Sequence, residues 1–241
     1  MIYGVILAAG VGKRMKTKDK KQFISINNKP ILYYSLEKFI KIKTIDVIII
    51  VINKKDENNS IILNLLNKYQ KIIKSNRLFI VLGGKERYDS VYNSLDFIKN
   101  FYGIGSKDKI LIHDAARPNV DIYDIKKLIN SLNKYKAVTL GYRLSDSIKR
   151  IKNNKNKPIK EVINSVNRDE YYLISTPQGF RIKDLYNAYK KFIVNKNKYK
   201  ITDDLQIIEY FTKIKTYILD SSKLNYKITV QDDLNMLKYI L

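Results

Sequence analysis

Short apolar runs alternate with segments of helical period along this chain. Apolar residues recur at helical spacing between 61 and 73 and again between 122 and 132. Five other runs have strand character and are almost entirely apolar, as expected where other elements cover both faces of a strand. They span residues 2–8, 47–52, 78–82, 109–113 and 137–140. This order predicts an α/β fold with a mostly parallel sheet flanked by helices.

The length and the composition favour one self-supporting domain. A chain of 241 residues can bury ~70–75% of its unfolded surface around a single core, so we predict one domain over residues 1–241. The absence of cysteine excludes a disulfide framework and indicates a reducing, cytoplasmic location. The longest aliphatic run, residues 47–52, is far shorter than the about 20 residues of a membrane-spanning helix, so we predict no membrane partner.

The net charge of +23 results from 46 Lys and Arg against 23 Asp and Glu. Proteins that bind nucleic acid specifically gather basic residues on one face or in a recognisable module. Here the basic residues are spread through every segment. We therefore expect a basic surface that favours small anionic ligands and no nucleic-acid partner. A protein that binds nucleotides or RNA without catalysis is the alternative from a different functional class.

One segment interrupts the alternation of strands and helices. Residues 144–151 (LSDSIKRI) and 159–166 (IKEVINSV) flank a polar tract at 152–158, which is the pattern of a two-stranded arm with a solvated tip, approximately residues 143–170. An isolated hairpin is only marginally stable in water. The arm is therefore expected to pack against a partner subunit or, alternatively, to fold back on its own domain.

The first predicted strand leads into LAAGVGKRM (7–15), followed by KKQF (20–23). Small residues and glycines allow backbone amides to approach a polyphosphate closely, while Arg14 and Lys21 add positive charge. The dinucleotide-binding fingerprint is excluded because its third glycine is missing, and the Walker A loop because no Gly-Lys-Ser/Thr follows. A plain tight turn is the alternative interpretation of these glycines.

Further motifs follow in a fixed order: GGKERYDSV (83–91), HDAARP (113–118), DSIK (146–149), VNR (166–168), TPQ (176–178), TDD (202–204) and NYKIT (225–229). With the opening loop, this series resembles the 2-C-methyl-D-erythritol 4-phosphate cytidylyltransferase family over nearly the whole chain. The resemblance implies a Rossmann-like nucleotidyltransferase fold with a protruding β-arm through which a homodimer forms.

The same resemblance implies an activity. A cytidylyl group would pass from CTP to 2-C-methyl-D-erythritol 4-phosphate, giving 4-diphosphocytidyl-2-C-methyl-D-erythritol and pyrophosphate for non-mevalonate isoprenoid synthesis. The partners would be CTP and a polyol phosphate. A cytidylyltransferase for ribitol 5-phosphate or another polyol phosphate is the alternative, although the two alanines of HDAARP favour methylerythritol phosphate.

The resemblance also assigns roles by position, with cations and amides for the phosphate groups and hydroxyl groups for the acceptor. The predicted catalytic residues are Arg14, Lys21, Arg168 and Lys227. The predicted nucleotide-binding residues are Ala8, Ala9, Gly10, Gly12, Gly84, Ser90, Asp114 and Ala115. The predicted acceptor-binding residues are Arg117, Ser147, Thr176 and Thr202. Mg²⁺ is expected to be carried mainly by the nucleotide phosphates, with no metal site built from protein ligands alone.

Some positions depart from the family or permit a structural interpretation. Lys20 stands where the family usually has proline, Lys85 where it often has an acid, and Ser147 where it has threonine. The Asp114 carboxylate could cap the following turn instead of contacting a ligand. His113, the only histidine, is predicted to be structural because a phosphate nucleophile is already ionised and needs no general base.

Overall fold

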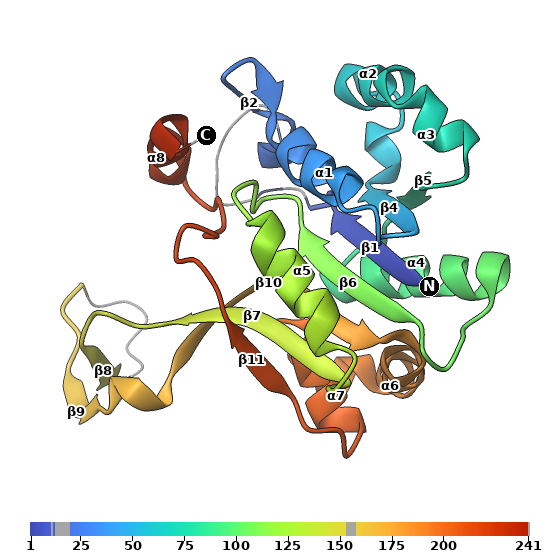
Figure 1. Ribbon diagram of the computed structural model, residues 1–241. Helices are drawn as coiled ribbons and strands as arrows, with labels where there is room; N and C mark the ends of the chain where they lie inside the picture. The colour runs from blue at the N-terminus through green and yellow to red at the C-terminus, as the bar shows by residue number, and fades with distance from the viewer. Residues whose placement is uncertain (11, 13–19, 153–157, 241) are drawn as a thin grey trace.

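A seven-stranded sheet forms the centre of the protein in a computed structural model that describes residues 1–10, 12, 20–152 and 158–240 (Figure 1). The strand order is β11-β7-β10-β6-β1-β4-β5. Neighbouring strands are parallel except β10, which runs antiparallel to both β6 and β7. The seven strands are β1 (Ile2–Leu7), β4 (Val47–Ile52), β5 (Leu78–Leu82), β6 (Lys109–Asp114), β7 (Ala137–Arg143), β10 (Tyr172–Arg181) and β11 (Tyr217–Asp220).

All five predicted strands belong to this sheet, and the predicted mostly parallel α/β architecture is confirmed. The two strands of this sheet that were not predicted are β10 and β11. Proline inside a run argues against a central strand, and β10 contains Pro177. The strand accommodates it because the pairing with β7 shifts register between Ile174 and Gln178.

Helices cover both faces of the sheet, which explains the continuous apolar runs. In β4, Ile48, Ile50 and Ile52 pack into the cluster on one face, while Val47, Ile49 and Val51 pack into the cluster on the other. The helices of the first face are α1 (Ile31–Lys41), α2 (Ser60–Lys68), α3 (Gln70–Lys74) and α5 (Ile122–Ser131). Those of the second face are α4 (Arg87–Tyr102), α6 (Ile182–Asn195) and α7 (Asp204–Phe211).

A smaller cluster attaches the C-terminal helix near the opening loop. Leu234 and Leu237 of α8 (Gln231–Ile240) pack with Ile26 and Ile31. Ile26 belongs to the short hairpin of β2 (Ser25–Ile26) and β3 (Lys29–Pro30). Four short 3-10 helices complete the described elements: η1 (Lys21–Phe23), η2 (Lys54–Asp56), η3 (Arg168–Glu170) and η4 (Lys196–Lys198).

The predicted arm is a separate two-stranded antiparallel sheet of β8 (Ile148–Ile151) and β9 (Val162–Val166). It projects away from the central sheet (Figure 1), so it does not fold back on its own domain. Its apolar side chains Ile151, Ile159, Val162 and Ile163 are exposed, Ile159 to 84%. Residues 153–157 at its tip lie outside the described residues.

No helix in the described part of the chain combines the length and the apolar character needed to cross a membrane.

Candidate active site

A cavity lies at the carboxyl ends of β1, β4, β5 and β6, the edge at which open α/β sheets bind ligands. Its volume is about 390 Å³. The loops that follow these four strands supply most of its wall, and two lysines from other segments complete it. Its described lining includes Ala9, Gly10, Lys21, Asn53, Gly84, Arg87, Ser90, Asp114, Ala115 and Lys227.

A second cavity of about 200 Å³ adjoins the first. Both are lined by Arg87, Asp114 and Lys227. The rest of the second wall includes Arg117 from the loop after β6, Thr176 and Gln178 from β10, and Thr202 and Asp203 from the segment before α7. Three charged side chains therefore stand at the boundary between two adjacent binding spaces.

The described part of the opening loop is held by one glutamine. The Nε2 of Gln22 donates to the carbonyl oxygens of Ala8 at 2.6 Å and Gly10 at 2.9 Å. Gly12 has a φ of +66°, a left-handed conformation that favours glycine. Sequence reasoning gave Gln22 no role, although its place beside Lys21 was a signal. Its two hydrogen bonds fix the backbone at Ala8 and Gly10, and Gly10 lines the first cavity.

Two lysines after the loop are held by different partners. The Nζ of Lys21 donates to the carbonyl oxygen of Ile228 at 3.0 Å, which connects the loop to the segment before α8. The Nζ of Lys20 lies 2.6 and 2.7 Å from the two carboxylate oxygens of Asp56 in η2. Lys20, which departs from the family pattern, thus joins the loop to the end of β4 by an ion pair.

The wall formed by residues 83–90 is closely packed. A Cβ on Gly83 would lie 2.7 Å from both the Cβ of Ala9 and the Oγ of Ser90, so only glycine fits there without movement of its neighbours. The backbone N–H of Gly84 donates to Ser90 Oγ at 3.1 Å. A reciprocal capping box between Glu86 and Asp89 then starts α4.

Asp114, the last residue of β6, is paired with two cations. The Nζ of Lys227 donates to its Oδ2 at 2.6 Å and the Nε of Arg87 donates to its Oδ1 at 3.3 Å. Burial would raise the pKa of Asp114, but Lys227, Arg87 and Arg117 together hold the pKa well below its ordinary value. The carboxylate therefore stays ionised and faces the two cavities; it does not cap the following turn.

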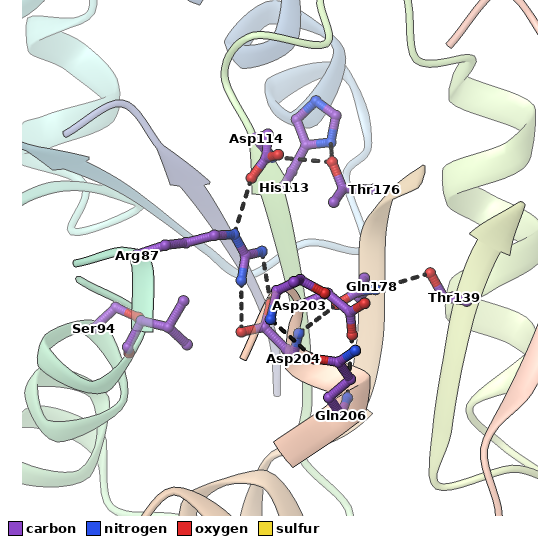
Figure 2. Close-up of polar contacts among 12 residues, drawn as sticks. Arg87, Ser94, His113, Asp114, Thr139, Thr176, Gln178, Asp203, Asp204 and Gln206 are labelled. Atoms are coloured by element: carbon purple, nitrogen blue, oxygen red, sulfur yellow. Dashed lines mark hydrogen bonds and ion pairs between the residues drawn. The ribbon is translucent and has the colours of Figure 1, made fainter. Parts of the chain in front are cut away.

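Arg87 is anchored on its other side by Asp204, as Figure 2 shows. Its Nη1 and Nη2 donate to the two Asp204 oxygens at 2.9 and 2.8 Å, and the hydroxyl of Tyr189 donates to the same carboxylate at 2.6 Å. Burial would lower the pKa of Arg87, but Asp204 and Asp114 raise it well above its ordinary value. Sequence reasoning missed Arg87 and Asp204, although both lie inside recognised motifs.

His113, next to Asp114 in β6, is fully buried. Its Nδ1 lies 3.1 Å from the Oγ1 of Thr176, and its Nε2 lies 3.2 Å from the carbonyl oxygen of Arg117. Burial lowers the pKa of His113 to about 3, so the ring is neutral at physiological pH. These contacts support the predicted structural role.

Thr176 and Arg117 form part of the second cavity. The backbone N–H of Asp114 donates to Thr176 Oγ1 at 3.0 Å. Arg117 donates from Nη1 to the carbonyl oxygen of Asn225 at 2.8 Å, and its buried Nε has no hydrogen-bond partner among the described residues. Burial lowers the pKa of Arg117 from its ordinary value.

These features can be compared with proteins of known family. The family model described as 2-C-methyl-D-erythritol 4-phosphate cytidylyltransferase, IspD, matches residues 2–241. The chain belongs to this family. It is therefore a cytidylyltransferase, a class of nucleotidyltransferase.

Individual relatives agree with the family assignment. A 2-C-methyl-D-erythritol 4-phosphate cytidylyltransferase from Clostridium botulinum (strain Langeland, type F) is 39% identical over 241 residues, covering 98% of this chain and 96% of the relative. One from Clostridium beijerinckii is 36% identical, covering 100% and 98%. The crystal structure of 4-diphosphocytidyl-2C-methyl-D-erythritol synthase from Anaerococcus prevotii has a TM-score of 0.80 at 31% identity, covering 99% and 95%. The predicted fold is thereby confirmed.

Most of the residues assigned from the family pattern gather at the two cavities. The first is lined by Ala9, Gly10, Lys21, Gly84, Ser90, Asp114, Ala115 and Lys227. The second is lined by Arg117, Thr176 and Thr202, again with Asp114 and Lys227. Ala8 and Gly12 lie in the opening loop but are not among the described lining residues.

Two assigned residues lie on the arm and line neither cavity. Ser147 and Arg168 are exposed on the arm, where the Nη1 of Arg168 donates to the carbonyl oxygen of Ser145. Arg14 lies outside the described residues. Of the four predicted catalytic cations, the structure therefore places Lys21 and Lys227 on one cavity and Arg168 away from it.

Proposed function

We propose that this chain transfers a cytidylyl group from CTP to 2-C-methyl-D-erythritol 4-phosphate, releasing pyrophosphate and supplying isoprenoid precursor synthesis. The observation that carries the proposal is the pair of adjoining cavities that share Asp114, Arg87 and Lys227. Two phosphorylated substrates must meet for the transfer, and two spaces with a common charged wall allow this. Membership in the cytidylyltransferase family supports the same donor and acceptor.

The first cavity would hold CTP. Amides of the loop around Gly10 suit the β- and γ-phosphates, because backbone N–H groups after a strand can approach a polyphosphate closely. Lys21, which lines the same wall, would stabilise the charge that develops as pyrophosphate leaves. The closely packed wall at Gly84 and Ser90 would bind the polar edge of the pyrimidine ring.

The second cavity would hold the polyol phosphate. Thr176 and Thr202 offer hydroxyl groups to the polyol, and Arg117 and Lys227 offer positive charge to its phosphate. An acceptor phosphate oxygen forms a bond to the α-phosphorus of CTP while the bond from that phosphorus to the bridging oxygen breaks, and pyrophosphate leaves with the electron pair. No general base is needed, which agrees with a buried, neutral His113.

Mg²⁺ would be held mainly by the triphosphate. No group of three or more potential metal-binding side chains gathers within residues 1–10, 12, 20–152 and 158–240, and Asp114 is already paired with two cations. Asp114 is the carboxylate that borders both cavities and would be the protein's nearest contribution to the ion. When bound, the ion would gather the phosphate oxygens and neutralise their charge.

The arm would complete the site of a second copy of the chain. Ser147 and Arg168 are exposed on it and line neither cavity of their own chain. The exposed apolar residues Ile159, Val162 and Ile163 on the same arm suit burial in a homodimer. Arg168 would then supply positive charge to the acceptor phosphate in the partner's second cavity.

The test is a comparison of acceptors with the purified chain. CTP, Mg²⁺ and either 2-C-methyl-D-erythritol 4-phosphate or ribitol 5-phosphate are supplied, and pyrophosphate release and the diphosphocytidyl product are measured. We expect turnover that depends on the methylerythritol acceptor and at least about tenfold less with ribitol phosphate. Faster turnover with ribitol phosphate would contradict the proposed acceptor, and no turnover with any polyol phosphate would contradict the reaction.

A further inference from the structure

Lys227 and Arg87 hold the Asp114 carboxylate in different ways. Lys227 offers a single ammonium at 2.6 Å on a side chain that is 33% exposed. Lysine is a compact charge on a flexible stem, so Lys227 can leave Asp114 for a phosphate in either cavity. The ammonium has three donors, so a phosphate that accepts from one of them shares its single positive charge and draws it away from Asp114.

Arg87, in contrast, is fixed from behind. Two of its nitrogens bind the Asp204 carboxylate in a bidentate pair, leaving Nε directed at Asp114. The Asp204 side chain is fully buried and also accepts a hydrogen bond from the Tyr189 hydroxyl. Asp204 is the first residue of α7, and its backbone N–H donates to the Gln178 side chain. The fork geometry of arginine makes such a pair directional.

This difference between Lys227 and Arg87 determines which cation remains beside Asp114 when a substrate phosphate binds. If Lys227 moves to a substrate phosphate, Asp114 loses its shortest ion pair, and an unpaired buried carboxylate is costly. Arg87 is the cation that stays beside it. Without Arg87, Asp114 would compete with the phosphate for the Lys227 ammonium.

We propose that Arg87, anchored by Asp204 and Tyr189, is a positioning residue that acts as the permanent counter-ion of Asp114 and thereby releases Lys227 to the reacting phosphates. The inference rests on the proposed transfer reaction. Arg87 also lines both cavities, but the inference assigns it no direct action on the reacting phosphates. Its effect on the reaction passes through Asp114.

A double-mutant cycle tests this route. The substitution Arg87→Met is expected to lower kcat by roughly a hundredfold, while the KM for CTP changes by less than about threefold. In an Asp114→Asn background the same substitution should cost less than about tenfold in kcat, because the carboxylate that holds Lys227 is gone. Tyr189→Phe should lower kcat only a few-fold, in the same direction.

Two further variants keep the cycle interpretable. Arg87→Met leaves Asp204 buried without its partner, so if that variant does not fold, Arg87→Met with Asp204→Asn takes its place in both backgrounds. Arg181→Met is the matched control, because Arg181 pairs in register with Lys109 at the opposite end of β6 and donates to carbonyl oxygens there. It should leave kcat and KM unchanged.

Two results would overturn the inference. One is an equal loss of kcat from Arg87→Met with and without the Asp114 carboxylate, and the other is a large rise in the KM for CTP. Either result would indicate direct contact between Arg87 and substrate. Wild-type protein that fails to turn over CTP with the methylerythritol acceptor would instead refute the proposed function. The two failures are therefore distinguishable.

Discussion

The carboxyl edge of the sheet and the arm contain assigned residues in very different environments. At the sheet edge, Asp114 is buried and bound by two cations, and Asp204 by an arginine and a tyrosine. On the arm, Ser147 and Arg168 are exposed. Groups at the sheet edge are thus oriented before any substrate binds, whereas groups on the arm need another surface to orient them.

The largest expected effect tests whether the sheet edge and the arm of one active site come from different subunits. Lys227→Met at the sheet edge and Arg168→Met on the arm should each lower kcat by about 10²–10³-fold, the scale for loss of one transition-state donor. If the arm serves the partner's site, a 1:1 mixture of the two variants regains about a quarter of wild-type activity, since half of the dimers are mixed and each has one intact site. Steady-state rates after co-expression measure this.

Arg150→Met is the control for the arm, because Arg150 is exposed on β8 and lies away from both cavities. It should retain nearly full activity. Absence of recovery in the mixed sample would show that the arm acts on its own chain. Full activity of Arg168→Met would show that Arg168 of the arm takes no part in the active site.

A smaller effect concerns acid stability of the buried edge. In the unfolded chain His113 binds a proton with its ordinary pKa of 6.5, whereas in the folded chain its pKa is about 3. The unfolded state therefore binds more protons between these values, and the free energy of unfolding falls as the pH falls, by up to about 1.4 kcal/mol per pH unit. Between pH 6.5 and 4.5 the expected loss is about 2–3 kcal/mol.

Urea unfolding at several pH values measures this loss in wild type and in His113→Asn, which cannot titrate. In the variant, the fall of unfolding free energy with pH that is due to His113 should disappear, whatever the variant's absolute stability. Asp114, whose pKa is depressed in the fold, contributes stability that is lost only as the pH falls below its ordinary pKa of 3.8, so it adds little to the slope between pH 6.5 and 4.5. An unchanged slope in the variant would show that His113 is not the group responsible.

The smallest expected effects compare one ion pair from each region. Lys20 pairs with the nearly buried Asp56 at the sheet edge, and Lys20→Ala should cost about 1–2 kcal/mol of unfolding free energy because Asp56 loses its partner. Lys152 pairs with Glu161 on the arm, where both side chains are well exposed. Lys152→Ala should change the stability by less than about 0.5 kcal/mol.

Thermal and urea unfolding of both variants give the comparison. Lys20→Pro, which introduces the residue usual in the family, should recover part of the loss by restricting the backbone. Equal effects of the two alanine variants would mean that burial does not distinguish the two ion pairs.

The strands were predictable because their burial on both faces can be recognised directly in the sequence. A strand covered on both faces is apolar at every position, as in residues 47–52, and this pattern needs no knowledge of the neighbours. The residues at the carboxyl ends of such strands, including Gly84 and Asp114, could be placed at one edge of the sheet because parallel strands end on the same side. β10 escaped prediction because its bulge and proline interrupt the pattern.

The local sequence by itself determined five of the seven strands of the central sheet, the α/β class and the family motifs, since each depends on residues adjacent in the chain. Only the tertiary structure decided which charges are partners. Arg87 and Asp204 are 117 positions apart yet lie within 2.9 Å of each other, because packing of α4, α6 and α7 on one face brings them together. Electrostatic energy depends on distance in space and on burial, and neither is written in the spacing of residues along the chain.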